Sequence, residues 1–282
     1  MIGKIKSYPK INLYLRITGK RKNGYHDIET LFVPLDNPYD EITISESGSK
    51  GISVSANSPT VPDGEKNICW RAAAKFAEKA EISPGWKIDI FKNIPVAAGL
   101  GGGSSNAAAV LKTLNKKYSK LSERELAEIA LSLGADVPFF LNPTPSLGKG
   151  TGEVLTPVEI HANFALILVN PLFPITAAWG YNNYIPCSRK TTLDEFIETL
   201  KEGKIPEYIV NDLSNAVFKK FPIMEILKDS MLNAGATCVG MSGSGPTLFG
   251  ICEFRSTAES AAEKLKKKFG NSIYCTTSSI LS

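Results

Sequence analysis

The sequence contains few of the residues that bind metals or carry redox chemistry. Its five cysteines are scattered between positions 69 and 275, and none of them belongs to a Cys-x-x-Cys pair. An odd number of cysteines without such spacing supports neither a zinc site nor a redox motif. We therefore expect reduced thiols in a cytoplasmic protein.

The sequence also has little excess of positive over negative charge. Lys and Arg together number 32 and Asp and Glu 28, so the net charge is +4. This excess is too small to indicate nucleic-acid binding, and no basic block with interleaved aromatic residues occurs. The basic run at 264–268 is interpreted as the end of a helix, where cations suit the helix dipole.

Long hydrophobic runs are absent. The longest clear apolar run, at 164–169, is far shorter than the roughly 20 residues that a membrane span needs. The first residues lack the apolar core of a signal peptide. With 43% hydrophobic and 21% charged residues, the composition is typical of a soluble globular protein. We expect no membrane partner.

Glycine is concentrated in the run Pro95-Val-Ala-Ala-Gly-Leu-Gly-Gly-Gly-Ser-Ser-Asn-Ala-Ala-Ala-Val110. Its order predicts a bare backbone loop that leads into a helix N-terminus. Unpaired N–H groups and the positive end of a helix dipole are what a phosphate chain requires. Glycine permits positive φ values and keeps side chains away from the ligand. The alternative is a glycine-rich turn before a helix that packs small residues in a core.

The same loop differs from two well-known phosphate sites. A Walker loop needs Lys and then Ser or Thr after its last glycine, but Ser104 follows Gly103 directly. A dinucleotide fingerprint needs Gly-x-Gly-x-x-Gly, and position 104 is Ser instead of Gly. These comparisons exclude both motifs and leave a generic anion site.

Hydrophobic periodicity predicts an α+β fold. Strands are expected at 11–17, 41–44, 51–54, 87–90, 164–169, 247–252 and 272–277. Helices are expected at 67–81, 104–117, 122–134, 192–203, 212–220, 223–233 and 256–269. Capping boxes starting at Ser122, Thr192 and Ser256 predict three of the helix starts. The succession of expected strands and helices restarts after Pro157, so we expect domains at 1–157 and 158–282.

Four separated segments, at 9–12, 95–105, 134–138 and 240–246, need a joint explanation. Together they resemble the GHMP kinase superfamily, because the long loop is similar to its Pro-x-x-x-Gly-Leu-Gly-Ser/Gly-Ser-Ser motif. The Ser242-Gly-Ser-Gly245 turn resembles its third motif, and the Lys10 segment its first. The resemblance implies an N-terminal ribosomal-protein-S5-domain-2-like ATP-binding domain and a C-terminal ferredoxin-like α/β layer. It also implies an active site in the cleft between them.

Further residues resemble one branch of this superfamily. They are Gly24-Tyr25-His26, Thr30-Leu-Phe, Asn67-Ile with Arg71-Ala, 134–140 and 148–153, and the likeness spans most of 7–251. Members of this branch phosphorylate a cytidine diphosphate sugar alcohol on the route to isoprenoid precursors that does not use mevalonate. The resemblance therefore implies ATP-dependent phosphorylation of the 2-hydroxyl of the methylerythritol part of such a substrate.

The resemblance also implies roles for individual residues. Lys10 and Asp136 are expected to act on the acceptor hydroxyl. Substrate binding is expected from Asn12, Tyr25, His26 and Tyr181. The residues expected to bind ATP are Asn67 and Ile68 on the adenine side and, around the triphosphate, Pro95, Val96, Ala97, Ala98, Gly99, Leu100, Gly101, Gly102, Gly103, Ser104, Ser105, Ser242 and Gly243. Mg²⁺ is implied by the triphosphate, but no carboxylate is a clear ligand.

The chemistry of these side chains fits their implied roles. A carboxylate at Asp136 can accept the hydroxyl proton, and the Lys10 ammonium can hold that carboxylate ionised. The face of Tyr25 can stack on a pyrimidine, while His26 can hydrogen-bond the polar edge of the base.

Taken alone, several of these residues allow simpler interpretations. Asp136 suits a loop carboxylate that binds local N–H groups, and Lys10 suits a surface lysine. Asn67 equally suits a helix N-cap. Trp179 is a rival to Tyr181 as the second stacking wall, and each also suits core packing.

Two other functions remain open from the sequence. One is another GHMP small-molecule kinase, of the homoserine or mevalonate type, which would have no use for Tyr25 and His26 as a base clamp. The other is a nucleotide-binding regulator without catalysis, which would not need Lys10 and Asp136. A small-molecule substrate and a monomer or weak homodimer are expected.

Overall fold

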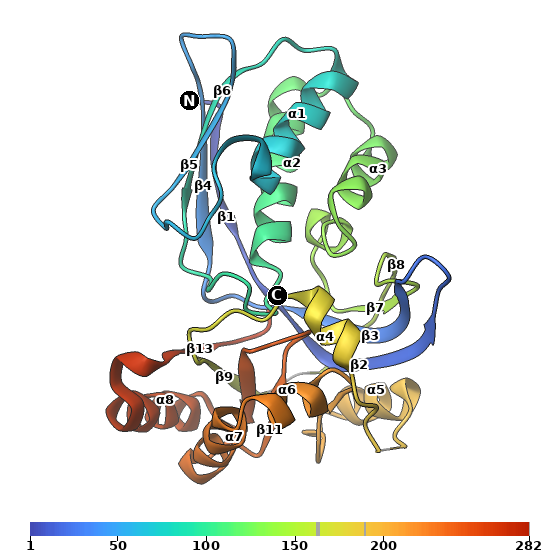
Figure 1. Ribbon diagram of the computed structural model, residues 1–282, viewed down its shortest axis with the longest axis vertical. Coiled ribbons are helices and arrows are strands. Elements are labelled where there is room, and N and C mark those ends of the chain that lie inside the picture. Colours follow the sequence, from blue (N-terminus) through green and yellow to red (C-terminus); the bar gives the residue numbers. More distant parts are fainter. Residues whose placement is uncertain (162–163, 189, 282) are drawn as a thin grey trace. The chain divides into compact units, whose positions relative to one another are not determined.

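The structure is a computed structural model that describes residues 1–161, 164–188 and 190–281 (Figure 1). The chain forms two compact units. The first consists of Met1–Pro9, Tyr39–Val96 and Gly101–Pro143, and the second of Lys10–Pro38, Ala97–Leu100 and the chain from Thr144 onward. Both units are discontinuous in sequence. The boundary expected at residue 157 cuts the chain only once, and it stays a prediction.

The first unit is a sheet with helices packed on one face (Figure 1). Its strand order is β1-β4-β6-β5, antiparallel except for the parallel pair β5–β6. Helix α2 packs against β1 and β4, and α1 packs against β5 and α2. The elements are β1 (Gly3–Ser7), β4 (Asp40–Glu46), β5 (Gly51–Ala56), β6 (Gly85–Phe91), α1 (Ile68–Ala80), α2 (Gly102–Tyr118), α3 (Glu123–Leu133) and the short helices η1 (Gly64–Lys66) and η2 (Pro138–Leu141).

The core of this unit forms where alternating strand residues meet the helix stripe. Phe76 of α1 and Trp86 of β6 are both buried, with ring centroids 6.2 Å apart. The Trp86 indole still finds a partner, because its N–H donates to the Tyr118 hydroxyl at 3.0 Å. This packing fixes α1 and α2, whose N-terminal ends carry the expected ATP residues.

The second unit begins with a sheet in the order β10-β2-β3-β7-β8. Strands β2 and β3 form its long antiparallel hairpin, with register shifts between Asn12 and Tyr14 and between Ile17 and Gly19. Such bulges re-aim the side chains next to them. The strands are β2 (Lys10–Lys20), β3 (His26–Pro34), β7 (Ser146–Lys149), β8 (Val154–Pro157) and β10 (Val210–Asn211).

The second sheet of this unit has the order β11-β12-β9-β13, with every neighbouring pair antiparallel. Helices α7 and α8 pack against it (Figure 1). In chain order this is the βαββαβ arrangement of a ferredoxin-like layer. The elements are β9 (Ala165–Asn170), β11 (Cys238–Met241), β12 (Leu248–Cys252), β13 (Tyr274–Ser278), α4 (Ala177–Asn183), α5 (Leu193–Lys201), α6 (Ser214–Lys220), α7 (Ile223–Ala234), α8 (Arg255–Phe269) and η3 (Gly270–Ser272).

Most expected elements are present, with local corrections. The capping boxes at Ser122 and Thr192 form as predicted. The one at Ser256 is wrong, because α8 already begins at Arg255, whose side chain holds the Glu259 carboxylate at 3.0 Å. The helix expected from Asp212 begins instead at Ser214. Among the helices of the described ranges, none has the length and apolar content needed to cross a bilayer.

Candidate active site

The middle of the glycine-rich loop is fastened to the Ser242 turn within the second unit. Gly99 has φ +77°, and a Cβ atom there would lie 2.1 Å from the Ser242 carbonyl oxygen. The Ser242 hydroxyl donates to the Gly99 carbonyl at 2.8 Å, and the Thr247 N–H donates to the Ala98 carbonyl at 3.2 Å. Only glycine permits this approach at position 99. The Ser242 side chain is fully buried, so it supports the loop. Its contact with ATP stays a prediction.

The next part of the loop forms the start of α2 in the first unit. Gly101 is the N-cap with φ +68°, and the helix begins at Gly102, two residues before the expected start. The first N–H groups of a helix have no partner within the helix, so this turn can bind an anion. Gly103 is exposed and Ser104 half-buried, whereas Ser105 is buried. The two serines therefore face different surroundings.

The adenine-side residues lie at the start of α1 in the same unit. The Asn67 side chain accepts the Cys69 N–H at 2.8 Å and donates to the Pro62 carbonyl at 2.8 Å. Asn67 is thus the helix N-cap, the simpler interpretation, and its contact with adenine stays a prediction. Ile68 is the first residue of α1, and its Cγ2 atom lies 3.8 Å from where a Cβ of Gly103 would be. The structure therefore brings Ile68 beside the loop.

Lys10 and Asn12 form a buried polar cluster at the start of β2. The Lys10 ammonium donates to Asn12 Oδ1 at 2.7 Å and lies 5.0 Å from the centroid of the Phe32 ring. Asn12 Nδ2 donates to Thr30 Oγ1 at 2.7 Å. Lys10 is only 4% exposed, so it is not the surface lysine of the simpler interpretation. Both side chains are held in fixed positions, which suits residues that must meet a reacting group.

The Ser242 turn lies beside this cluster. A Cβ atom at Gly243, where φ is +54°, would lie 3.3 Å from Asn12 Oδ1. Asn211 holds the turn in place, because its Nδ2 donates to the carbonyls of Met241 and Gly243 at 2.7 and 2.9 Å. The sequence did not single out Asn211 for this task. Asn-Asp-Leu at 211–213 was visible, but no local pattern relates it to a turn about 30 residues later.

An aromatic cluster lies elsewhere in the second unit. The His26 and Tyr181 rings stack with centroids 5.5 Å apart, and Tyr184 meets His26 edge-on at 5.5 Å. Burial, and to a smaller extent the charge of Lys20, lowers the pKa of His26. Tyr25 is 64% exposed next to His26 in sequence. The structure thus brings together two of the residues expected to bind the base.

Trp179, the rival to Tyr181, points to a different neighbour. Its ring packs against Phe221 with centroids 6.1 Å apart, and the Lys220 ammonium lies 4.5 Å from its centroid. Tyr181 is therefore the aromatic residue of α4 that meets His26. The sequence left this choice open because both residues follow β9 at similar distances.

Asp136 lies in the first unit, in the turn that follows α3. The helix ends at Leu133, and the Val137 N–H closes the turn by donating to the Gly134 carbonyl at 3.1 Å. Asp136 is half-buried, while its neighbour Val137 is fully buried and anchors the turn. Its expected pairing with Lys10 stays a prediction. Within the described ranges, no three His, Cys, Asp or Glu residues gather as a metal site.

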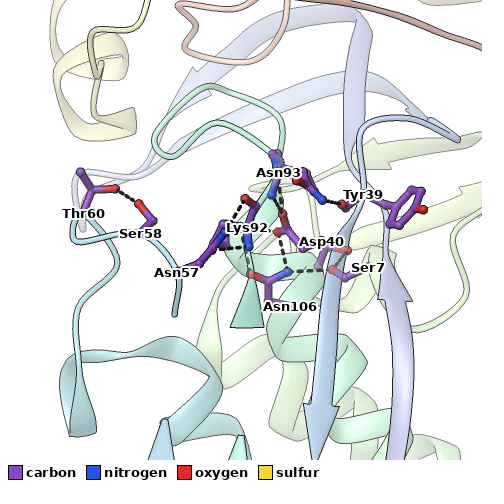
Figure 2. Close-up of polar contacts among 11 residues, drawn as sticks. Ser7, Tyr39, Asp40, Asn57, Ser58, Thr60, Lys92, Asn93 and Asn106 are labelled. Atoms are coloured by element: carbon purple, nitrogen blue, oxygen red, sulfur yellow. Dashed lines mark hydrogen bonds and ion pairs between the residues drawn. The ribbon is translucent and has the colours of Figure 1, made fainter. Parts of the chain in front are cut away.

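A buried polar network below the loop was not expected from the sequence (Figure 2). The Lys92 ammonium forms an ion pair with Asp40, and their side chains are 7% and 0% exposed. Asn106 of α2 bonds to both of these residues and to Ser7. Lys92 stands three residues before Pro95, and nothing in its local sequence marks it as part of this network.

Two family models match the chain. The model described as the GHMP kinases N terminal domain matches residues 67–142, and that described as GHMP kinases C terminal matches 190–271. A 4-diphosphocytidyl-2-C-methyl-D-erythritol kinase from Citrifermentans bemidjiense is 41% identical over 93% of both chains. The chain belongs to this family of GHMP kinases. A second relative of that name, from Prosthecochloris aestuarii, is 37% identical over 94% of both chains.

Solved structures agree with this assignment. The crystal structure of a 4-(cytidine 5'-diphospho)-2C-methyl-D-erythritol kinase is 31% identical, with a TM-score of 0.82 over 98% of this chain and 99% of that one. A homoserine kinase from Cytophaga hutchinsonii is 18% identical with a TM-score of 0.74, covering 98% and 95%, and shows the shared fold alone. The expected α+β GHMP kinase fold is confirmed. So is the expectation of a small-molecule kinase, and GHMP kinases use ATP as phosphate donor.

Proposed function

We propose that the chain transfers the γ-phosphate of ATP to the 2-hydroxyl of 4-diphosphocytidyl-2-C-methyl-D-erythritol. The observation that carries the substrate is the stack of His26 on Tyr181. A homoserine or mevalonate kinase has no base to clamp, whereas aromatic faces and an imidazole suit a cytosine. Tyr25, exposed beside His26, supplies a further face. The relatives at 37–41% identity carry the same substrate in their names.

The triphosphate would bind the loop at 95–105. The first turn of α2 supplies N–H donors, and the glycines from Gly99 to Gly103 let phosphate oxygens approach the backbone. We propose Mg²⁺ as the counter-ion of the triphosphate, because its charge must be offset during transfer. Mg²⁺ takes much of its coordination from phosphate oxygens and water, so a dedicated cage of carboxylates is not needed.

Lys10 and Asp136 would act on the acceptor hydroxyl. Asp136 accepts the proton as the hydroxyl oxygen forms its bond to the γ-phosphorus, while the bond from that phosphorus to ADP breaks. Lys10 stabilises the charge that develops there, and Asn12 keeps its ammonium in place at 2.7 Å. Holding donor, acceptor and cation in line is most of what phosphoryl transfer asks of a protein.

A coupled assay of ADP release with the purified protein tests this proposal. Turnover is expected with 4-diphosphocytidyl-2-C-methyl-D-erythritol and not with homoserine or mevalonate. Turnover of homoserine or mevalonate in its place would reject the substrate but keep the kinase family.

The variant Asp136→Asn separates a kinase from a nucleotide-binding regulator. It should lose roughly 100-fold or more in kcat while the Kd for ATP stays close to that of the parent. Asp63→Asn, an exposed carboxylate of the same unit, is the matched control and should leave kcat unchanged. Full activity of Asp136→Asn would reject the proposed catalytic role.

A further inference from the structure

One buried carboxylate holds both ends of the glycine-rich loop (Figure 2). On the entering side, Asp40 Oδ1 accepts the backbone N–H groups of Asn93 and Ile94 at 2.8 and 2.9 Å, immediately before Pro95. On the leaving side, Asp40 Oδ2 accepts Asn106 Nδ2 at 2.8 Å, immediately after Ser105. Residues that border the loop on either side therefore share a single anchor inside the first unit.

Charge fixes the direction of the hydrogen bonds around this anchor. The Lys92 ammonium can only donate, so the oxygen of the Asn106 amide faces it at 3.0 Å. The ionised Asp40 can only accept, so the Asn106 nitrogen faces the carboxylate. The second proton on that nitrogen goes to Ser7 Oγ at 2.9 Å. The Ser7 hydroxyl in turn donates a hydrogen bond to Ser105 Oγ at 2.7 Å.

Ser105 is the last member of this relay. It is 4% exposed, and its hydroxyl receives the Ser7 proton inside the unit. Ser104, one residue earlier, is half-buried and Gly103 is exposed. The chain therefore turns one serine toward the interior and leaves its neighbours at the surface of the loop.

The first turn of α2 lies directly over the ion pair. A Cβ atom at Gly102 would lie 3.3 Å from Lys92 Nζ and 3.0 Å from Ile94 Cγ2. The absence of a side chain at Gly102 lets the helix start approach the buried cation. The same turn is the source of the N–H donors for phosphate, so its position depends on what lies beneath it.

We propose that Asp40, Lys92, Asn106 and Ser7 form a positioning frame for the phosphate site, and that Ser105 acts as part of this frame. The frame holds the segment before Pro95 and the first turns of α2 in the shape that binds a polyphosphate. It touches neither phosphate nor acceptor itself. This inference rests on the proposed binding of the ATP triphosphate at residues 95–105.

Ser7→Ala is the variant that tests the frame. Replacing Asp40 would leave the buried Lys92 charge without its partner and risks loss of folding. Removing the Ser7 hydroxyl leaves the ion pair intact and cuts only the last two bonds of the relay. Ser7→Thr keeps a hydroxyl and is the conservative rescue.

Ser230→Ala is a matched control from the second unit. Ser230 is 6% exposed, compared with 3% for Ser7. Like Ser7, it makes one donated and one accepted side-chain bond, to the Ile226 carbonyl at 2.7 Å and from Lys268 Nζ at 2.8 Å. Ser230→Ala therefore measures how much stability is lost when a buried hydroxyl is removed outside the frame.

Calorimetric binding of ATP and of adenosine is the measurement, supported by KM values. Ser7→Ala should raise the Kd for ATP by about 3- to 10-fold, because two hydrogen bonds of the frame are lost and only part of their free energy is expressed at the phosphate site. The Kd for adenosine and the KM of the acceptor substrate should not change. Ser7→Thr should restore ATP binding, and Ser230→Ala should lower the melting temperature without changing the Kd for ATP.

A double-mutant cycle decides whether Ser105 acts through the frame. If it does, Ser7→Ala combined with Ser105→Ala weakens ATP binding no more than either change alone. If the fold-changes in the Kd for ATP of the two single variants multiply in the double variant, Ser105 acts on phosphate independently and its place in the frame is overturned. An unchanged Kd for ATP in Ser7→Ala would overturn the frame as a whole. Failure of the parent protein to bind ATP would instead reject the proposed function.

Discussion

The imidazole of His26 lies nearly parallel to the phenol ring of Tyr181, with 17° between the two planes. His26 is the first residue of β3, and Tyr181 belongs to α4, which follows β9 far along the chain. Both are in the second unit. Two residues assigned to one task from distant sequence segments therefore meet in the folded protein.

Replacing Tyr181 should weaken binding of the cytidine substrate. Stacking contributes about 0.5–1.5 kcal/mol beyond buried area, so Tyr181→Ala should raise the KM of this substrate by about 2- to 12-fold. The KM of ATP should stay the same. Trp179→Ala serves as the comparison, because Trp179 packs on Phe221 instead of His26. Steady-state kinetics with both variants checks this prediction, and a larger effect from Trp179→Ala would contradict it.

The lowered pKa of His26 should make stability depend on pH. Burial, followed by the charge of Lys20, moves this pKa below its ordinary value of about 6.5. Below pH 6.5 the unfolded chain takes up the proton more readily than the folded protein, so the free energy of unfolding falls as the pH drops. This loss ends once the pH is below the folded pKa. Urea unfolding at several pH values should show this slope in the parent and a smaller slope in His26→Gln.

Adding one methyl group at Gly99 should disrupt the loop. The left-handed backbone at this position would cost an alanine about 1–2 kcal/mol of stability, and its methyl group would also clash with the Ser242 carbonyl. Gly99→Ala should therefore destabilise the protein by more than that amount and weaken ATP binding. Gly48→Ala is the control, since nothing lies within 4 Å of its Cβ position. Thermal unfolding and ATP titration of the two variants would measure the difference, and equal stability would contradict the close approach.

Four of the five thiols should resist alkylation in the folded protein. Burial raises the pKa of Cys69 and Cys238 to about 12 and that of Cys252 and Cys275 to about 11. At pH 8 these groups remain protonated, and the thiolate is the reactive form. Cys187 is half-buried and should react alone with iodoacetamide. Peptide mass spectrometry checks this, with urea-unfolded protein, in which all five should react, as the control.

Local signals in the sequence predicted the helices better than the strands. Asn67, Ser122 and Thr192 cap their helices because each cap needs partners only two or three residues away. The capping box at Ser256 did not form, because α8 begins at Arg255 with Phe254 as its N-cap, and Glu259 bonds to the Arg255 side chain instead. Strand β3 was missed because its last five residues, from Thr30 to Pro34, are all buried and show no alternation.

The site divides in the same way. Motifs named Lys10, Asn12 and the glycine-rich loop, because these residues follow one another in recognisable order. Asp40 and Asn211 were missed, since their importance depends on hydrogen bonds to segments about 30 to 66 residues away. A single sequence holds no local sign of such pairings.

The two compact units exchange the chain five times, after Pro9, Pro38, Val96, Leu100 and Pro143. A cut at residue 157 would leave β2 without its parallel neighbour β10 and would separate Gly99 from Ser242. The fragments 1–157 and 158–282 should therefore not fold independently of each other. For the same reason, a single recombination event cannot exchange one unit between two related genes without breaking the other.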